Sequence, residues 1–201
     1  AARMEILRTL LRLRQVCCHL ELLRLPQTSF EAPSAKLDLL FELLDEACDG
    51  GHRVLVFSQF VSMLAIIRRE LDRRGWRYCY LDGATVNRLE VVHQFNRDRT
   101  IPVFLISLKA GGTGLNLVGA DTVILYDPWW NPAVEDQAID RAHRIGQTRH
   151  VYSVRLIARG TIEERVQNLQ RRKQELIRAA VQAGGGAERL SWEDLRELLD
   201  L

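Results

Sequence analysis

The chain has 201 residues, of which 47% are hydrophobic and 27% charged, an ordinary composition for one soluble globular domain with appendages. The net charge of +2 neither requires nor excludes a nucleic-acid partner, because a local patch matters more than the sum. No segment is long and apolar enough to span a membrane and no signal peptide opens the chain, so we expect no membrane partner. The sequence is already helical in character at Ala1, so we expect it to be part of a longer protein.

The first predicted element is an amphipathic helix over residues 3–24. Its apolar side is predicted to carry Leu7, Leu10, Leu11, Leu13 and Val16, with Arg3, Arg8, Arg12 and Arg14 around it. Within this helix, Cys17, Cys18 and His19 are consecutive, while Cys48 and Cys79 are isolated. Without a C-x-x-C pair, small buried thiols in a reducing environment explain them better than a metal, and we predict no metal site.

A linker from Pro26 to Pro33 separates this helix from the next. Ser34 is a suitable N-cap for a helix over residues 35–48, and Gly50 and Gly51 would end it. We therefore place a domain boundary at residues 33 and 34.

From residue 54 onward, strand-like and helix-like segments alternate. The predicted strands cover residues 54–60, 76–82, 103–108, 122–127 and 151–158. One predicted helix follows the first strand and ends at about residue 74. Further helices are predicted over residues 88–96, 132–145 and 161–182. Short apolar strands that alternate with helices predict an α/β fold, a parallel sheet with helices on both faces. Beyond it, glycines 184–186 form a flexible break before a small helix over residues 191–199, so three regions are predicted: 1–33, 34–182 and 183–201.

Polar or glycine-rich segments follow four of the predicted strands. They are Ser58-Gln59-Phe60, Asp82 to Thr85, Ser107 to Leu117 and Asp127 to Pro132. Ligands of open α/β sheets bind at the carboxyl ends of the strands, so these segments predict a site at that edge. At the first two, Ser58, Gln59 and Thr85 could contact phosphate, or could simply form turns and cap helices.

The segment from Ser107 to Leu117 has glycines at 111, 112 and 114 and a lysine, Lys109, at its rim. Glycines let the backbone approach a phosphate and present N–H groups to it, although a tight turn needing positive φ would use them too. The segment is no Walker A loop, because no Gly-Lys-Ser/Thr ends it.

Two tryptophans, Trp129 and Trp130, lie between prolines in the segment Asp127 to Pro132. Exposed tryptophans in a rigid loop commonly contact a base, a sugar or a partner. The alternative is that both pack under the loop, and we expect one buried and one available.

The segment from Gln137 to Arg149 contains Arg141 and Arg144, three residues apart and so expected on one helix face. A guanidinium keeps its charge and matches phosphate oxygens, and an arginine finger can accelerate phosphoryl transfer about a thousand-fold or more. The alternative is a helix with a capping salt bridge. Since the chain has neither a Walker A lysine nor an acidic pair for magnesium, the other half of such a site must come from another domain.

Taken together, these segments resemble the second, C-terminal RecA-like lobe of Snf-family ATPases, the double-stranded DNA translocases of superfamily two. Residues 54–60 are similar to motif IV, Ser107 to Leu117 to motif V and Gln137 to Arg149 to motif VI, and residues 120–132 are close to a family signature. The resemblance runs from residue 11 to about residue 178. It implies a RecA-like lobe of the P-loop NTPase type that lacks Walker A and has a helical N-terminal extension.

The resemblance also implies roles for the matching residues. Arg141 and Arg144 would be arginine fingers, and Gln137 would help to orient them. Gly112, Gly114 and Asn116 would lie near the nucleotide. Lys109, Ser107 and Trp129 would face DNA, with Thr85, Ser58 and Gln59 as further contacts. ATP with Mg²⁺ would be bound mainly by the N-terminal lobe of the same parent chain, and double-stranded DNA would be the partner.

The sequence departs from the family pattern at Leu108 and Leu20, and the loop between Gly83 and Arg88 is short, as in bacterial-type members. We therefore expect a bacterial-type protein, cytoplasmic and nucleoid-associated, or nuclear if the source is eukaryotic. The implied function is the motor lobe of a DNA-dependent ATPase, inactive in hydrolysis by itself. The alternatives are a non-catalytic scaffold lobe that binds DNA or protein and the lobe of a strand-separating helicase, with a small-molecule Rossmann enzyme a distant third because no G-x-G-x-x-G follows a strand.

Overall fold

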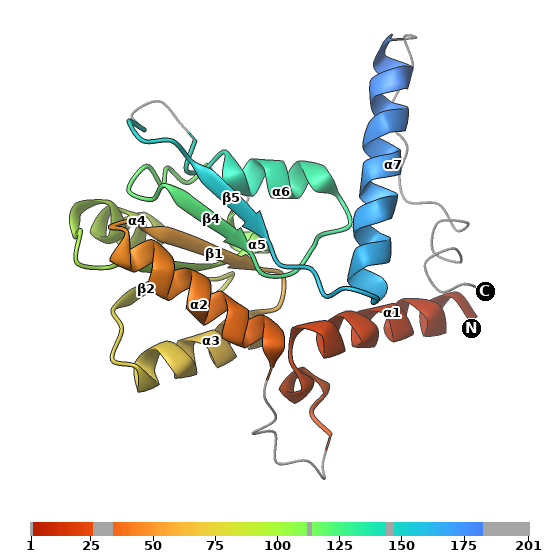
Figure 1. The fold of residues 1–201 in the computed structure, drawn as a ribbon, viewed down its shortest axis with the longest axis horizontal. Helices are drawn as coiled ribbons and strands as arrows, with labels where there is room; N and C mark the ends of the chain where they lie inside the picture. The colour runs from red at the N-terminus through yellow and green to blue at the C-terminus, as the bar shows by residue number, and fades with distance from the viewer. Residues whose placement is uncertain (1, 26–33, 112–113, 144–146, 183–201) are drawn as a thin grey trace.

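The computed structural model describes residues 2–25, 34–111, 114–143 and 147–182. The predicted linker before Ser34 and the C-terminal segment after residue 182 lie outside these ranges. Within them the chain forms five parallel strands and the helices that cover them (Figure 1). The predicted α/β fold is confirmed.

The strands lie in the order β2-β3-β1-β4-β5, all parallel. Their bounds are β1 Val54–Ser58, β2 Tyr78–Leu81, β3 Val103–Ser107, β4 Thr122–Leu125 and β5 Tyr152–Arg155. The three central strands, β1, β3 and β4, are buried along their whole length, as short apolar runs in a sheet covered on both faces should be. In contrast, β5 is an edge strand whose residues are largely exposed. It is therefore less buried than its sequence predicted.

Alternate residues of β1 point to opposite faces of the sheet and into two separate cores. Val54 and Val56 pack with helices α2 (Ala35–Asp49) and α3 (Val61–Arg73). Leu55 and Phe57 pack on the other face with α4 (Arg88–Arg97), α5 (Leu108–Gly111) and α6 (Pro132–Ile139). The sheet is therefore the middle layer of three.

Helix α2 begins and ends where the sequence predicts. The Ser34 hydroxyl accepts a hydrogen bond from the backbone N–H of Leu37, and Gly50 is the C-cap. Gly51 then adopts a φ of +71°, a conformation that glycine takes without steric cost.

The first helix is shorter than predicted. Helix α1 (Ala2–Cys18) ends before His19, whose extended backbone and ring nitrogen Nδ1 cap a separate 3₁₀ helix, Leu20–Leu23. The hydroxyls of Tyr126 and Ser34 both donate to the carbonyl of Cys18, which would otherwise have continued the helix. The predicted apolar side was also wrong in part. Of its five residues only Leu10 is buried, while Leu7, Leu11, Leu13 and Val16 are exposed.

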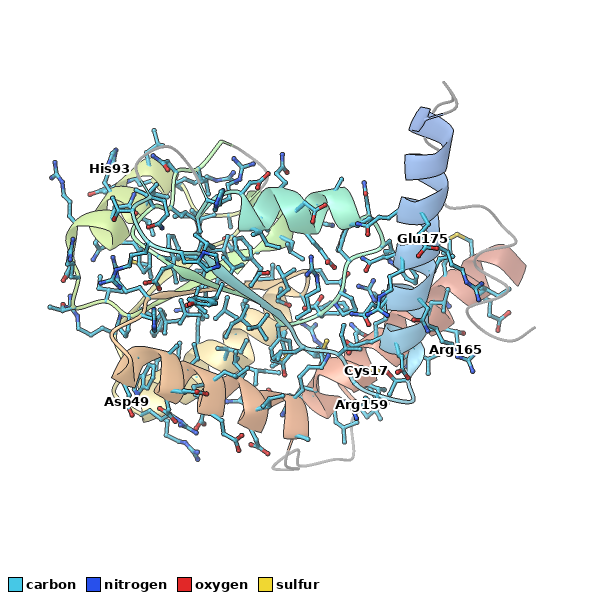
Figure 2. The ribbon with its side chains drawn as sticks, turned by 45° about the horizontal axis from the view of Figure 1, so that its top comes forward. Cys17, Asp49, His93, Arg159, Arg165 and Glu175 are labelled. Carbon is cyan, nitrogen blue, oxygen red and sulfur yellow. The ribbon has the colours of Figure 1, made fainter. Side chains whose placement is uncertain are left out.

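Helices α1 and α7 (Ile162–Gln182) extend from one end of the sheet and lie against each other near their bases (Figure 1). A small core of Leu10, Ile162, Val166 and Leu169 joins them. Figure 2 shows the same junction, with Cys17 of α1 near Arg159 of the segment that leads into α7 and Arg165 of α7 itself. None of the described helices is both long enough and apolar enough to cross a membrane.

Candidate functional site

The carboxyl ends of the strands gather at the end of the sheet that faces α1 and α7 (Figure 1). Strands β1 and β3 end in register, with Ser58 directly beside Ser107. The segments that follow β1, β3 and β4 therefore start from one edge, as the sequence predicts for a ligand site.

Both serines are enclosed at this edge. Ser58 is 0% and Ser107 2% exposed, so neither hydroxyl is presented at the surface of this lobe. The Ser58 hydroxyl donates to Oδ1 of Asp127 at 2.5 Å, and the backbone N–H of Gln59 donates to Oδ2 at 3.3 Å. Asp127 is itself completely buried, and this burial raises the pKa of its carboxyl. The carboxylate thus ties the end of β1 to the segment after β4.

Arg14 of α1 holds the segment with the two tryptophans from the other side. Its guanidinium donates to the carbonyl of Pro128 and lies 4.7 Å from the ring centroid of Trp130 and 5.9 Å from that of Phe60. Arg14 is only 2% exposed, and burial lowers its pKa. The helix that precedes the predicted lobe is therefore built into the candidate site.

Trp129 is held through its backbone. Its N–H donates to Oε1 of Glu135 at 2.7 Å, and its carbonyl accepts from Gln170 of α7. Glu135 also accepts from Arg155 of β5 at 2.8 Å. Both tryptophan side chains are half-buried, Trp129 against the sheet and Trp130 against α1 and α7, so the predicted division into one buried and one available was wrong.

The glycine-rich segment after β3 joins the arginine segment through its backbone. Lys109 is exposed in α5, Gly114 has a φ of +56° and Asn116 is exposed. The backbone N–H of Leu117 donates to the carbonyl of Arg141 at 3.0 Å. Gly112 lies outside the described residues.

The arginine segment does not continue α6 as the sequence predicts. Helix α6 ends at Ile139, and Arg141 lies in the turn that follows, 2% exposed. The Arg141 carbonyl accepts a hydrogen bond from Leu117, a residue distant in sequence, instead of one from a further turn of the helix. The expectation that Arg141 and Arg144 project from one helix face therefore fails for Arg141, and Arg144 lies outside the described residues. Gln137 is exposed on α6.

Gln147 adds a second link, from the arginine segment to the residues that directly follow the glycine-rich segment. Its side-chain amide donates to the carbonyls of Ala120 at 2.7 Å and Val118 at 3.3 Å. Sequence reasoning missed this role, although the Gly-Gln-Thr-Arg run was conspicuous. It also missed Arg14, Glu135 and Gln170, because nothing in the sequence shows which polar helix residues turn inward.

Thr85 lies in the turn after β2, where its hydroxyl accepts from the Asp82 N–H at 3.0 Å and donates to Asp82 Oδ1 at 3.2 Å. The N-cap position of α4 is Asn87, so Thr85 is not its cap. Among the described residues, no group of three or more His, Cys, Asp or Glu side chains could hold a metal ion.

The helicase conserved C-terminal domain matches residues 35–146 of this chain. Among curated proteins, the chromatin-remodeling ATPase INO80 of Pyricularia oryzae is 49% identical over 160 residues, 79% of this chain and 8% of that protein. The INO80 ATPase of Aspergillus oryzae is 47% identical over 163 residues, 79% of this chain and 11% of that protein. The chain thus spans about a tenth of the length of these relatives. They are eukaryotic, so they give no support to a bacterial-type protein.

Two solved structures share the fold. The C-terminal part of the Fun30 ATPase domain superposes with a TM-score of 0.68 and 34% identity, over 92% of this chain and 56% of that one. The C-terminal domain of the Sulfolobus solfataricus SWI2/SNF2 ATPase gives a TM-score of 0.71 and 31% identity, over 96% of this chain and 80% of that one.

Proposed function

The chain belongs to the helicase conserved C-terminal domain family, as the C-terminal lobe of a Snf2-family ATPase, and on this premise we propose that it is a motor lobe. The whole protein would couple ATP hydrolysis to movement along double-stranded DNA. The joining of the glycine-rich segment to the arginine segment carries this proposal, through Leu117 N–H to Arg141 and through Gln147 to Ala120. A charge that stabilises a transferring phosphoryl must be fixed before the reaction, and this double link fixes the backbone that bears it.

In this proposal Arg141 and Arg144 are arginine fingers, and Gln137 helps to orient their segment. Gly112, Gly114 and Asn116 line the nucleotide side of the lobe. ATP with Mg²⁺ would be held mainly by the N-terminal lobe of the parent chain. This division fits the described residues, which offer buried and exposed guanidinium groups but no cluster of metal ligands. Hydrolysis would then require both lobes, and regions 1–33 and 183–201 would be appendages of this one.

DNA contacts are proposed at the carboxyl edge of the sheet, where Lys109 is exposed and Trp129, Thr85 and Gln59 are half-buried. Ser58 and Ser107 would support this edge from inside, because their hydroxyls are enclosed. A translocase that ignores sequence should hold phosphates rather than base edges, which suits one lysine and backbone donors. The INO80 relatives are chromatin-remodeling ATPases, so we place the parent protein at chromosomal DNA, in the nucleus if its source is eukaryotic.

The test is ATP hydrolysis by the complete parent chain, with and without duplex DNA, for the wild type and for Arg141→Ala and Arg144→Ala. Duplex DNA should stimulate the wild type, and each substitution should lower turnover about a thousand-fold while ATP still binds. Arg97→Ala is the matched control, since this exposed arginine ends α4. Normal turnover in both variants would reject the finger roles. An ATPase indifferent to DNA would favour a scaffold, and strand displacement would favour a helicase.

A further inference from the structure

A polar cavity lies at the opposite end of the sheet from the site described above. Its volume is about 410 Å³, within the roughly 300–1,000 Å³ usual for small-molecule pockets. The chain enters β1 and β4 here, at Arg53 and Asp121, and the end of α4 and residues 147–149 close the sides. Figure 2 places this end by Asp49, next to the cavity on α2, and by His93 of α4, both far from the α1–α7 junction.

The floor of the cavity is fixed by internal hydrogen bonds. The Arg53 guanidinium donates to the carbonyls of Ile101, Gly119, Phe95 and Asp98, and it lies 3.9 Å from the ring centroid of Phe95. Asn96 donates to the carbonyl of Asn116 and accepts from Gly119 N–H. Since these groups are held by the backbone, the cavity does not depend on a ligand for its shape.

The lining carries a net positive charge. It contains three guanidinium groups, those of Arg53, Arg99 and Arg149, against one carboxylate, that of Asp121, which leaves +2 with His52 neutral. Burial raises the pKa of the Cys48 thiol to about 11, so this lining residue adds no negative charge near neutral pH. Anions are therefore the class of ligand that the cavity attracts.

Two of the arginines keep donors for a ligand. Among the described residues, Arg149 donates only through Nη1, to Asp121 at 2.8 Å and to the Gly51 carbonyl at 3.1 Å. Its Nε and Nη2 groups have no hydrogen-bond acceptor among these residues. Arg99 is exposed and makes neither a hydrogen bond nor an ion pair with any described residue. Thr148 also lines the cavity. Two guanidinium groups that line one cavity offer planar forks of N–H donors, which suit the oxygens of phosphate.

We propose that this cavity binds a phosphate group, with Arg99 and Arg149 as its ligands and Arg53 as a fixed positive floor. The phosphate could belong to a free polyphosphate anion or to the backbone of duplex DNA. Because Thr148 and Arg149 continue the segment that Gln147 ties to the glycine-rich loop, an occupant would contact that segment directly. This site is independent of the proposed ATPase.

The test is an isothermal titration calorimetry experiment at low salt, in which inorganic tripolyphosphate is titrated into the 201-residue chain. We expect saturable one-to-one binding that weakens as salt is added, because screening shortens the reach of these charges. Arg99→Gln and Arg149→Gln should each weaken binding about ten-fold, the loss expected when one charged hydrogen-bonding partner is removed. Arg97→Gln removes the same charge at the end of α4, two residues before Arg99, but Arg97 does not line the cavity, so this variant should bind normally.

Arg149→Gln could disturb the fold, since Arg149 bridges Asp121 and Gly51, but Arg99→Gln breaks no described hydrogen bond or ion pair and decides the case. Absence of saturable binding, or an equal loss in Arg97→Gln, would overturn the proposal. A 20-base-pair duplex is titrated in parallel. If Arg99→Gln weakens duplex binding as much as tripolyphosphate binding, the phosphate is that of DNA. If it weakens only tripolyphosphate binding, the ligand is a free anion.

Discussion

At the scale of single residues, Arg14 is a buried charged side chain that holds the segment with the two tryptophans. It donates to the Pro128 carbonyl, covers Trp130 and contributes a positive charge near the buried Asp127. Arg14→Met keeps much of the volume but leaves the carbonyl without this donor and the carboxylate without this charge. We expect the free energy of unfolding to fall by about 3 kcal/mol, measured by urea denaturation.

Arg12→Met is the control for this change, because Arg12 is exposed on the same helix, and it should stay within about 0.5 kcal/mol of wild type. An equal, small effect of both substitutions would show that α1 does not hold the tryptophan segment.

Asp121 should make stability depend on acidity. Burial by itself would raise the pKa of Asp121, but hydrogen bonds from Arg149, His52 and the Arg53 N–H outweigh it and lower the pKa. The fold therefore favours the ionised carboxylate. The stability it gives is present above the ordinary aspartate pKa of about 3.9 and is lost as pH falls through the lower folded-state value. Asp121→Asn should be less stable than wild type at pH 7, and its unfolding free energy should vary less between pH 5 and pH 2.

The comparison is Asp49→Asn, which removes an exposed carboxylate at the end of α2. This variant should lose stability between pH 5 and pH 2 as the wild type does. If the unfolding free energy of Asp121→Asn varied with pH below pH 5 as much as that of the wild type, other carboxylates would control the loss of stability in acid.

At the scale of elements, α7 is joined to α2 by one buried ion pair. Glu163 is 0% exposed, accepts from Lys36 and also accepts from the Ala158 N–H at 2.9 Å. Removing one member of a buried pair leaves an uncompensated charge, so Glu163→Ala should cost about 3–5 kcal/mol. Thermal unfolding followed by circular dichroism measures the loss. Glu164→Ala is the matched variant, since the exposed Glu164 accepts, among the described residues, only from Gly160 N–H, and its cost should be below about 1.5 kcal/mol.

The elements themselves were predictable where one local signal decides them. The central strands are apolar runs with no competing pattern, and α2 has a serine before it and glycines after it, so both could be located from sequence. The ends of α1 and α6 could not. Each is set by a hydrogen bond from a residue distant in sequence, Tyr126 to Cys18 and Leu117 to Arg141.

The candidate site divides in the same way. The glycine and arginine segments were recognisable from local composition. The enclosure of Ser58 and Ser107 follows from the strand pairing that sets them side by side, which no local pattern reveals. Arg14 was missed for the same reason, because Pro128 and Trp130, which it contacts, lie more than a hundred residues away.

At the scale of the whole molecule, the two ends of the sheet present different surfaces, and the proposed motor function places its DNA contacts at the carboxyl end. If Lys109 contacts one phosphate there, Lys109→Gln should weaken duplex binding on any sequence. It should also reduce the slope of log affinity against log salt by about 1, because one counterion fewer is released. Fluorescence anisotropy with a labelled duplex at several salt concentrations measures both quantities. Arg73→Gln, which removes an exposed charge at the end of α3, should leave the slope unchanged. An unchanged slope in Lys109→Gln would move the DNA contact away from α5, even if the affinity falls.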